Sequence, residues 1–147
     1  QAQDFWHLRE TIPEGQMIEG ATIKHDISVP VSSVPKFLKN VEEAINQLVP
    51  GIRICAFGHL GDGNIHYNLT TPEAVSPKTF FDKVEDINRT IHDEAVALDG
   101  SISAEHGIGI SKRLELMHYK SANALDIMRG VKQALDPQNI MNPGKVL

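Results

Sequence analysis

The sequence is short of several features, and each shortage narrows what the protein can be. It has one cysteine, Cys55, which excludes an internal disulfide and fits a reducing compartment. No apolar run reaches the roughly 18–20 residues that a membrane-spanning helix needs, and no signal-peptide pattern opens the chain. Its 14 Lys and Arg residues are outnumbered by 19 Asp and Glu and form no basic stripe, so nucleic acid is not an expected partner.

What remains is the composition of an ordinary globular protein. The 147 residues are 41% hydrophobic and 22% charged, which suits one domain with a substantial core. The chain starts Gln1-Ala2-Gln3 without a Met, and a helix-like stretch follows at once. We therefore expect a domain excised from a longer protein, in which a site shared between domains is only partly present.

The N-terminal part predicts a short helix and a strand. Residues 4–11 fit one or two helical turns, which Pro13 and Gly15 are expected to stop. Residues 23–31 alternate between apolar and polar side chains, the pattern of a half-buried strand. The polar face of this strand would carry Lys24, Asp26 and Ser28.

A helix and a hairpin follow. Apolar side chains recur at helical spacing between residues 37 and 48, after a Ser-Val-Pro start and before Pro50-Gly51. Residues 52–57 and 64–69 alternate again, and the Gly-Asp-Gly-Asn run 61–64 between them is a strong turn signal. The two runs are expected to pair as antiparallel strands.

The rest of the chain predicts mainly helices. A long helix is expected from Ser76-Pro77 to Leu98, then a short strand at 101–104, a helical turn or two after Ser111, and a helix at 121–135. Strands interleaved with two long amphipathic helices predict an α+β fold. We expect an antiparallel sheet with helices packed on one face, of the ferredoxin-like kind, plus C-terminal helices.

Residues 58–68, Gly-His-Leu-Gly-Asp-Gly-Asn-Ile-His-Tyr-Asn, carry the first candidate chemistry. The period of two puts Asn64, His66 and Asn68 on one strand face, looking at solvent or at a site, and Ile65, Tyr67 and Leu69 on the other. His59 ends the neighbouring strand and can approach His66. Imidazole and carboxylate ligands together suit zinc, iron or manganese. The alternative, that these histidines only hydrogen-bond within turns, stays open from the residues alone.

Glu105 and His106 form the second candidate group, at the predicted end of a strand and before Gly107. Glu105 can serve as a metal ligand while His106 acts as a base, since a histidine titrates near neutral pH. Coordination by both residues is an open alternative. Arg9 and Lys24 are candidate anchors for a substrate carboxylate, although each taken alone is an ordinary surface charge.

Three separated motifs carry a family resemblance. They are residues 58–66, Glu105-His106-Gly107-Ile108-Gly109, and the closing Asn142-Pro143-Gly144-Lys145. With the stretch from Trp6 to Glu10, they resemble the C-terminal part of FAD-linked oxidases. The branch is that of the D-lactate, glycolate and D-2-hydroxyglutarate dehydrogenases of the vanillyl-alcohol oxidase superfamily. The resemblance covers nearly the whole chain, 1–147.

The resemblance implies a domain that caps the substrate side of a flavin. FAD would be bound mainly by an N-terminal domain that is absent from this chain, and the isolated chain would be inactive. A D-2-hydroxy acid would be oxidised to a 2-oxo acid. The protein would lie in the bacterial cytoplasm or the mitochondrial matrix, without a membrane span, and it would form a homodimer.

The resemblance also implies residue roles. His59, His66 and Glu105 would bind a divalent metal, usually zinc and in some members iron or manganese. His106 would be the catalytic base, and Asn142 would lie near the flavin. Pro13 stands where several relatives carry Ser or Thr as a substrate contact, which leaves room for a substrate different from theirs. The substrate contacts would be Arg9, Lys24 and Asn68.

Two other functions remain open from the residues. One is a metal-dependent hydrolase, in which the same ligands activate water and no flavin is needed. The other is a non-catalytic association domain that a structural metal stabilises.

Overall fold

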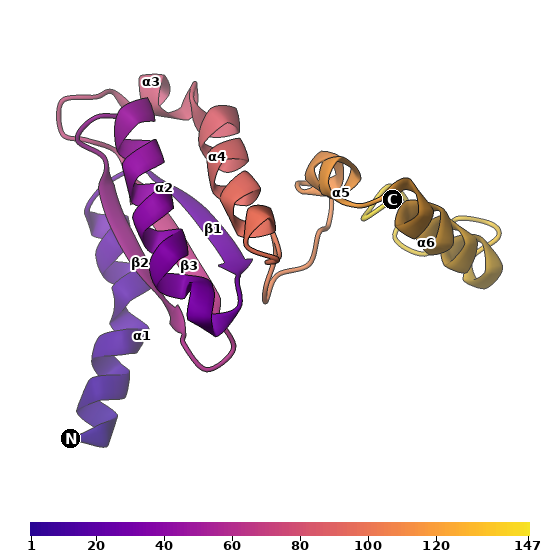
Figure 1. Cartoon of the computed structure of the whole chain (residues 1–147), viewed down its shortest axis with the longest axis horizontal. Helices are drawn as coiled ribbons and strands as arrows, with labels where there is room; N and C mark the ends of the chain where they lie inside the picture. Colours follow the sequence, from indigo (N-terminus) through magenta and orange to yellow (C-terminus); the bar gives the residue numbers. More distant parts are fainter. The chain divides into compact units, whose positions relative to one another are not determined.

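A computed structural model describes residues 1–147 as two compact units, Gln1–Ala104 and Glu105–Leu147. Figure 1 labels the elements in chain order. The first unit contains α1 (Ala2–Ile18), β1 (Thr22–Ser28), the 3-10 turn η1 (Val31–Ser33), α2 (Val34–Leu48), β2 (Arg53–His59), β3 (Asn64–Thr70), α3 (Pro77–Phe81) and α4 (Val84–Ala97). The second unit contains α5 (Arg113–Tyr119) and α6 (Ala122–Leu135). None of these helices has the length and apolar character that crossing a bilayer requires.

The first unit is built on a three-stranded antiparallel sheet in the order β1-β3-β2. This confirms the predicted α+β class and the hairpin of β2 and β3. Strands β1 and β2 flank β3 and are connected through α2, which is the split arrangement of a ferredoxin-like fold. The predicted strand at 101–104 contributes only one bridge, between Ser101 and Ser28 on the free side of β1.

One face of the sheet carries the hydrophobic core. Its apolar side chains pack against α2 and α4, which run side by side in Figure 1. The Tyr67 and Phe37 rings meet edge to face with their centroids 5.8 Å apart, and burial raises the pKa of the Tyr67 phenol. The fully buried members of this core include Ile27, Phe37, Val41, Ile45, Tyr67, Leu69, Ile87 and Ile91.

Helix α1 differs from its prediction, because it continues through Pro13 and Gly15 to Ile18. An interior proline removes one helical hydrogen bond and crowds the carbonyl four residues earlier, so the continuation of α1 has to be stabilised by other contacts. The end of α1 beyond Pro13 is held by the sheet, since Gln16 accepts a hydrogen bond from Asn68 and Glu19 follows with an ion pair to Arg53. These contacts lie far along the sequence, so local helix-stop rules could not anticipate them.

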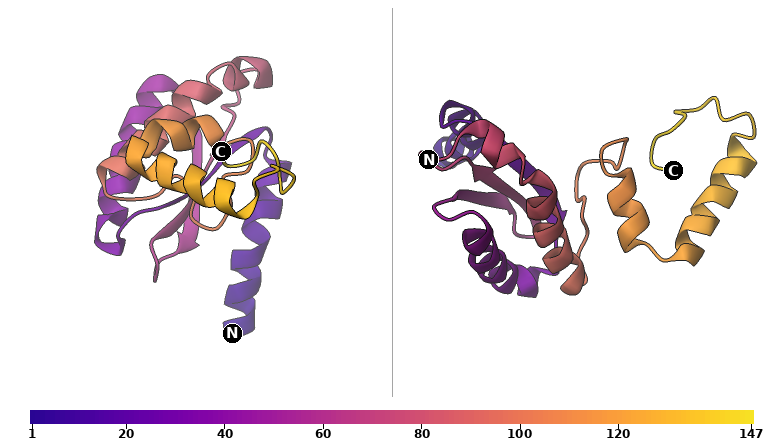
Figure 2. Two further views of the ribbon diagram at one scale, coloured as in Figure 1. Left: turned by 90° about the vertical axis from the view of Figure 1, so that its right-hand side faces the viewer. Right: turned by 90° about the horizontal axis from the view of Figure 1, so that it is seen from above.

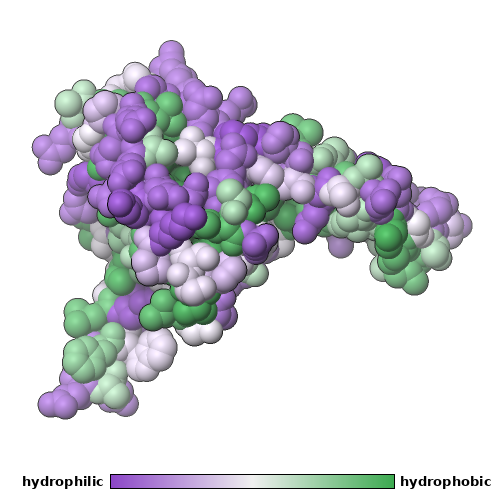
Figure 3. Space-filling model, viewed as in Figure 1, coloured by the Kyte–Doolittle hydropathy of each residue, from purple (hydrophilic) through white to green (hydrophobic).

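Several apolar side chains of α1 are exposed. The N-terminal end of the helix projects beyond the sheet in Figures 1 and 2, and Figure 3 shows hydrophobic atoms gathered over it. Isolated exposed apolar residues are common, but a helix with so many indicates a surface that another polypeptide can cover. The exposed apolar residues of α1 are Phe5, Trp6, Leu8, Met17 and Ile18.

The predicted long helix after Ser76 is interrupted, so that α3 ends at Phe81 and α4 begins at Val84. Ser76 caps α3 as expected, because its hydroxyl accepts the Thr79 N–H at 3.2 Å. The interruption coincides with Lys83, whose ammonium group donates to the Leu48 carbonyl at the end of α2, at 2.7 Å. No Gly or Pro marks this break, which explains why the sequence pattern did not show it.

In the second unit, Asp136 organises the chain after α6. Its carboxylate accepts the N–H groups of Ile140 and Met141, each at 2.9 Å, and a hydrogen bond from the Lys132 ammonium. The Lys132 ammonium also donates to the Met141 carbonyl at 2.6 Å. The Lys132 hydrogen bond, with those from the two backbone N–H groups, holds the pKa of Asp136 below its ordinary value.

Candidate metal and substrate site

The face of the sheet opposite the core, here called the polar face, carries the candidate site. Directly opposite residues on antiparallel strands point to the same side, so the register places side chains in rows across β1, β3 and β2. The row that contains the predicted metal ligand His66 is Asp26, His66 and Phe57. The rows on either side of it are Ser28, Asn64 and His59, and Lys24, Asn68 and Cys55.

The predicted common face of Asn64, His66 and Asn68 is therefore confirmed, but it does not face solvent as a whole. Asn64 is only 4% exposed and Asn68 only 3%. Helix α1 covers part of this face, because Gln16 contacts Asn68 and Arg9 lies against Phe57. Part of the polar face is thus covered by α1, whereas His59 and Lys24 on the same face are exposed.

Asp26 lies at the centre of this site, and the sequence had shown it only as a polar-face residue. Its buried carboxylate accepts the Asn64 side-chain N–H at 2.9 Å and the Ala104 backbone N–H at 3.2 Å. The Asp26 backbone carbonyl is also 3.2 Å from the Ala104 N–H. Asp is disfavoured inside strands, so its presence in the predicted strand was the one sequence signal that Asp26 has a special role. The contact between Asp26 and His66 follows from the register of β1 on β3, which the sequence does not show.

His66 lies directly across from Asp26. Its Nδ1 is 3.7 Å from the Asp26 Oδ1, and the ring is partly exposed. The ring centroids of His66 and His59 are 6.5 Å apart, so the two predicted histidine ligands come together near the turn end of the hairpin. The second ring neighbour of His66 is Phe57, with its ring centroid 5.1 Å from that of His66.

Two glycines of the motif are required by close packing of the hairpin. A Cβ on Gly58 would stand 2.0 Å from the Asn64 carbonyl oxygen, and one on Gly63 would stand 1.9 Å from the Val29 carbonyl oxygen. Gly63 also has a positive φ of 74°. The Asp62 carboxylate accepts the Asn64 N–H at 3.0 Å and closes the turn. The turn therefore fixes how His59 and His66 face each other.

The predicted carboxylate anchors are also on the polar face. The Arg9 guanidinium lies over the Phe57 ring, with its carbon 4.7 Å from the ring centroid. Phe57 therefore lies between Arg9 and His66, a role that the sequence did not reveal. Lys24 is exposed and shares its row with Asn68.

The remaining predicted residues belong to the second unit. Glu105 directly follows Ala104, whose backbone Asp26 holds, and both Glu105 and His106 are exposed. Asn142 is exposed in the C-terminal turn, with a positive φ of 48°, and its carbonyl accepts the Lys145 N–H at 3.3 Å. It lines a mainly apolar cavity of about 570 Å³ together with Ile127, Val131 and other residues of this unit.

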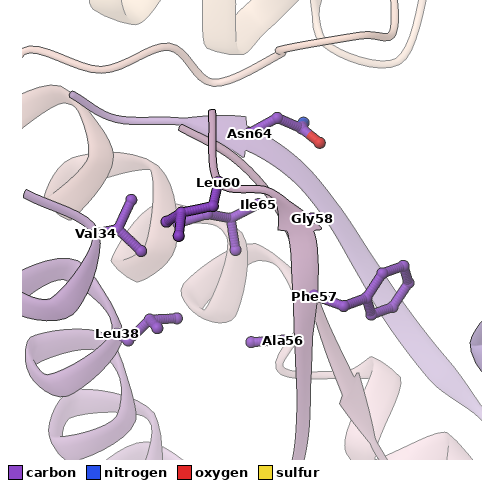
Figure 4. A pocket seen from close by; sticks show the side chains of 8 residues that line it. All are labelled: Val34, Leu38, Ala56, Phe57, Gly58, Leu60, Asn64 and Ile65. Carbon is purple, nitrogen blue, oxygen red and sulfur yellow. The ribbon is translucent and has the colours of Figure 1, made fainter. Parts of the chain in front are cut away.

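A separate apolar cavity of about 120 Å³ lies between α2 and the hairpin. In Figure 4, Leu60, Ile65, Val34 and Leu38 surround it, whereas the side chains of Asn64 and Phe57 point away. No titratable side chain lines it. The chemistry-bearing residues therefore lie on the other face of the sheet.

This fold and its polar face define a small α+β domain with a candidate binding site, and comparison with known proteins identifies the family. Residues 1–146 match the family described as FAD linked oxidases, C-terminal domain. The chain belongs to this family, which confirms the resemblance. It spans about a quarter to a third of the curated relatives described next.

Three relatives illustrate the similarity. A D-2-hydroxyglutarate dehydrogenase of Stutzerimonas stutzeri is 41% identical over 146 residues, which are 99% of this chain and 31% of the relative. A mitochondrial D-2-hydroxyglutarate dehydrogenase of Danio rerio is 36% identical, over 97% of this chain and 26% of the relative. The glycolate oxidase subunit GlcD of Bacillus subtilis is 37% identical, over 88% of this chain and 27% of the relative.

Proposed function

We propose that this chain is the substrate- and metal-binding part of a flavin-dependent dehydrogenase that oxidises a D-2-hydroxy acid to a 2-oxo acid. The observation that carries the proposal is the convergence of His59, His66 and Asp26 on one face, with Arg9 beside them. Membership of the FAD-linked oxidase family supports the reaction class.

The donor set fits a divalent cation. Asp26, His66 and Glu105 each offer one ligand atom, either a ring nitrogen or a carboxylate oxygen, and His59 adds a second imidazole near His66. The buried carboxylate of Asp26, beside His66, supplies negative charge that a bound cation would balance. Mixed imidazole and carboxylate donors suit zinc, manganese or iron. A cation bound here would lower the pKa of the substrate hydroxyl.

The chain's own residues would bind and orient the substrate. Arg9 and Lys24 would hold the carboxylate, and the stacking of Arg9 on Phe57 limits where that guanidinium can lie. Asn68 would contact the substrate from the next row of the sheet. His106 would accept the hydroxyl proton.

FAD would be held mainly by another domain, with Asn142 of this chain near it. Bound FAD would supply the acceptor for the hydrogen and electron pair that leave C2. The exposed apolar side chains of α1 and of the second unit, among them Leu114, Ile127 and Leu135, support association with another polypeptide surface. We propose that the FAD-binding domain covers part of them.

The names of the relatives suggest D-2-hydroxyglutarate as the first substrate to test, with D-lactate and glycolate next. The test is a substrate screen of the full-length protein with an artificial electron acceptor, together with elemental analysis. We expect a D-2-hydroxy acid to be turned over and about one equivalent of a divalent metal per chain. Hydrolysis of an ester or amide by the isolated chain would instead support a metallohydrolase.

A single substitution tests the proposed base. His106→Ala in the full-length enzyme should lower turnover by about 10²-fold to 10⁴-fold, the usual contribution of general base catalysis, while FAD stays bound. His118→Ala, at an exposed histidine of α5, is the matched control. Unchanged turnover of the His106 variant would exclude its assignment as the base.

A further inference from the structure

Gln16 is the one buried residue of α1, and it contacts the polar face directly. Its side-chain oxygen accepts a hydrogen bond from the Asn68 amide at 2.6 Å. The two side chains are almost fully buried, at 6% and 3% exposure. Gln16 and Asn68 are called the carboxamide pair below.

The carboxamide pair satisfies only half of its hydrogen-bonding groups. No protein group hydrogen-bonds the Gln16 Nε2 or the Asn68 Oδ1, and both atoms are buried. Exchanging oxygen and nitrogen in both amides leaves the same count, because one NH₂ group and one carbonyl oxygen still lack partners. Buried groups of this kind are uncommon and call for an explanation, such as a ligand.

The carboxamide pair lies close to the predicted metal ligand His66. Asn68 and His66 are two residues apart on β3, and therefore point the same way about 7 Å from one another. Arg9, Pro13 and Gln16 have the i, i+4, i+7 spacing of one helix face, so Gln16 continues along α1 the line that Arg9 begins. Lys24 is in the same sheet row as Asn68 and adds a positive charge.

A cavity of about 350 Å³ adjoins the pair, lined by Gln16, Ile12, Cys55 and Thr70 among others. Arg53 and Glu19 also line it and are engaged with each other, with a 2.7 Å ion pair between them. Arg53 donates further to the carbonyls of Glu19 and Thr71. The buried polar atoms without protein partners in this region are the free amide groups of the carboxamide pair and the Arg53 Nε.

We propose that Gln16, held in place by its hydrogen bond from Asn68, determines substrate specificity by binding, with Lys24, a polar group at the end of the substrate remote from the reacting hydroxyl. The substrate class is a 2-hydroxy acid with a second carboxylate, separated from C2 by a short methylene chain that spans one row of the sheet. The free NH₂ donates to that carboxylate, and Lys24 balances its charge. This inference rests on the proposed dehydrogenase function and adds a residue that selects the substrate.

The experiment compares D-2-hydroxyglutarate, which has the second carboxylate, with D-lactate, which lacks it, in the full-length enzyme. Gln16→Leu should lower the ratio of kcat/KM values, hydroxyglutarate over lactate, about tenfold, because one hydrogen bond to a charged group is lost. The loss should fall mainly on KM. Gln16→Glu keeps the shape but repels a carboxylate, so its ratio should fall further.

Gln47→Leu, at an exposed glutamine of α2, is the control and should leave the ratio unchanged. An unchanged ratio in both Gln16 variants, or equal losses on the two substrates, would overturn the proposal. Retained flavin absorbance and thermal midpoint show that the variants fold. If Gln16→Leu fails to fold, the near-isosteric Gln16→Glu variant replaces it. Competitive inhibition by glutarate should then be weaker in Gln16→Glu than in the wild-type enzyme, and equal inhibition would overturn the proposal. A wild-type enzyme that oxidises neither acid would contradict the proposed function itself, a separate outcome.

Discussion

The imidazole of His66 lies 3.7 Å from the carboxylate of Asp26, measured from Nδ1 to Oδ1, at directly opposed positions of β3 and β1. A histidine beside a carboxylate is a common arrangement around metals, where the carboxylate fixes the ring and raises its basicity. The Asp26 side chain is itself fixed, because Asn64 and Ala104 donate hydrogen bonds to it. The strand register and these two hydrogen bonds together place the Asp26 carboxylate beside His66.

The first prediction concerns metal binding by this pair. Asp26→Asn should weaken divalent metal affinity about 10-fold to 100-fold, the usual cost of losing a carboxylate beside a metal-binding histidine. Competition with a chromogenic chelator measures the affinity. Asp82→Asn, at an exposed aspartate after α3, serves as the control. Equal metal affinities of the Asp26→Asn and Asp82→Asn variants would show that Asp26 does not contribute to metal binding.

The second prediction concerns Phe57, which supports Arg9. Phe57→Leu removes the ring under the guanidinium, an interaction worth about 0.5–1 kcal/mol. We expect KM for the hydroxy acid to rise about threefold with little change in kcat, because Arg9 would hold the carboxylate less firmly. Phe81→Leu, on the exposed side of α3, is the control. A fall in kcat without a change in KM would contradict this role.

The third prediction tests the packing of the hairpin. Gly58→Ala should destabilise the first unit by about 3 kcal/mol, the upper end for overpacking, because the new methyl would meet the Asn64 backbone. Gly61→Ala should have a far smaller effect, because no atom lies within 4 Å of the place that its methyl would take. Urea unfolding followed by circular dichroism compares the two. Similar midpoints would show that the hairpin can open at Gly58.

The fourth prediction concerns pH and the C-terminal turn. The pKa of Asp136 is lowered, first by the Lys132 hydrogen bond, so its stabilising effect is complete above the ordinary Asp pKa of about 3.9. The effect is lost as pH falls further, through the lower folded-state value. Hydrogen-exchange protection of the Ile140 and Met141 amides should therefore decline in that acidic range.

Two variants check this assignment. Asp136→Asn should reduce the protection of both amides already at neutral pH and remove most of its acid dependence. Asp126→Asn, at an exposed aspartate of the same helix that pairs with Arg129, should leave the protection unchanged. A pH profile that is the same in all three proteins would assign the titration to another group.

Much of the sheet could be predicted from local patterns. Alternation located β2 and β3, and the Gly-rich turn showed that they pair, which placed His59 near His66. Helix α2 followed from its apolar spacing and the proline at its start. These features depend on residues close in sequence, where periodicity and turn chemistry are informative.

The features that the sequence did not show depend on contacts between distant residues. Asp26 and His66 are far apart along the chain, and only the register of β1 on β3 makes them neighbours. Gln16 can contact Asn68 only because α1 continues beyond Pro13, which the local helix-stop signals did not predict. Burial of Asn68 likewise required α1, whose Gln16 contacts it, whereas Asn64 is buried beside Asp26. The roles of Glu105, His106 and Asn142 stay predictions.

The Ala104 N–H donates to both the carboxylate and the backbone carbonyl of Asp26. Asp26 therefore affects two parts of the candidate site, the proposed metal ligands and the proposed base. The Asp26 carboxylate lies beside His66 and also holds the backbone of Ala104, the residue directly before Glu105 and His106. A change at Asp26 would therefore loosen both its contact with His66 and the backbone position that precedes Glu105 and His106. Enzymes that keep His59, His66, Glu105 and His106 but lose this aspartate should accordingly be impaired in both respects at once.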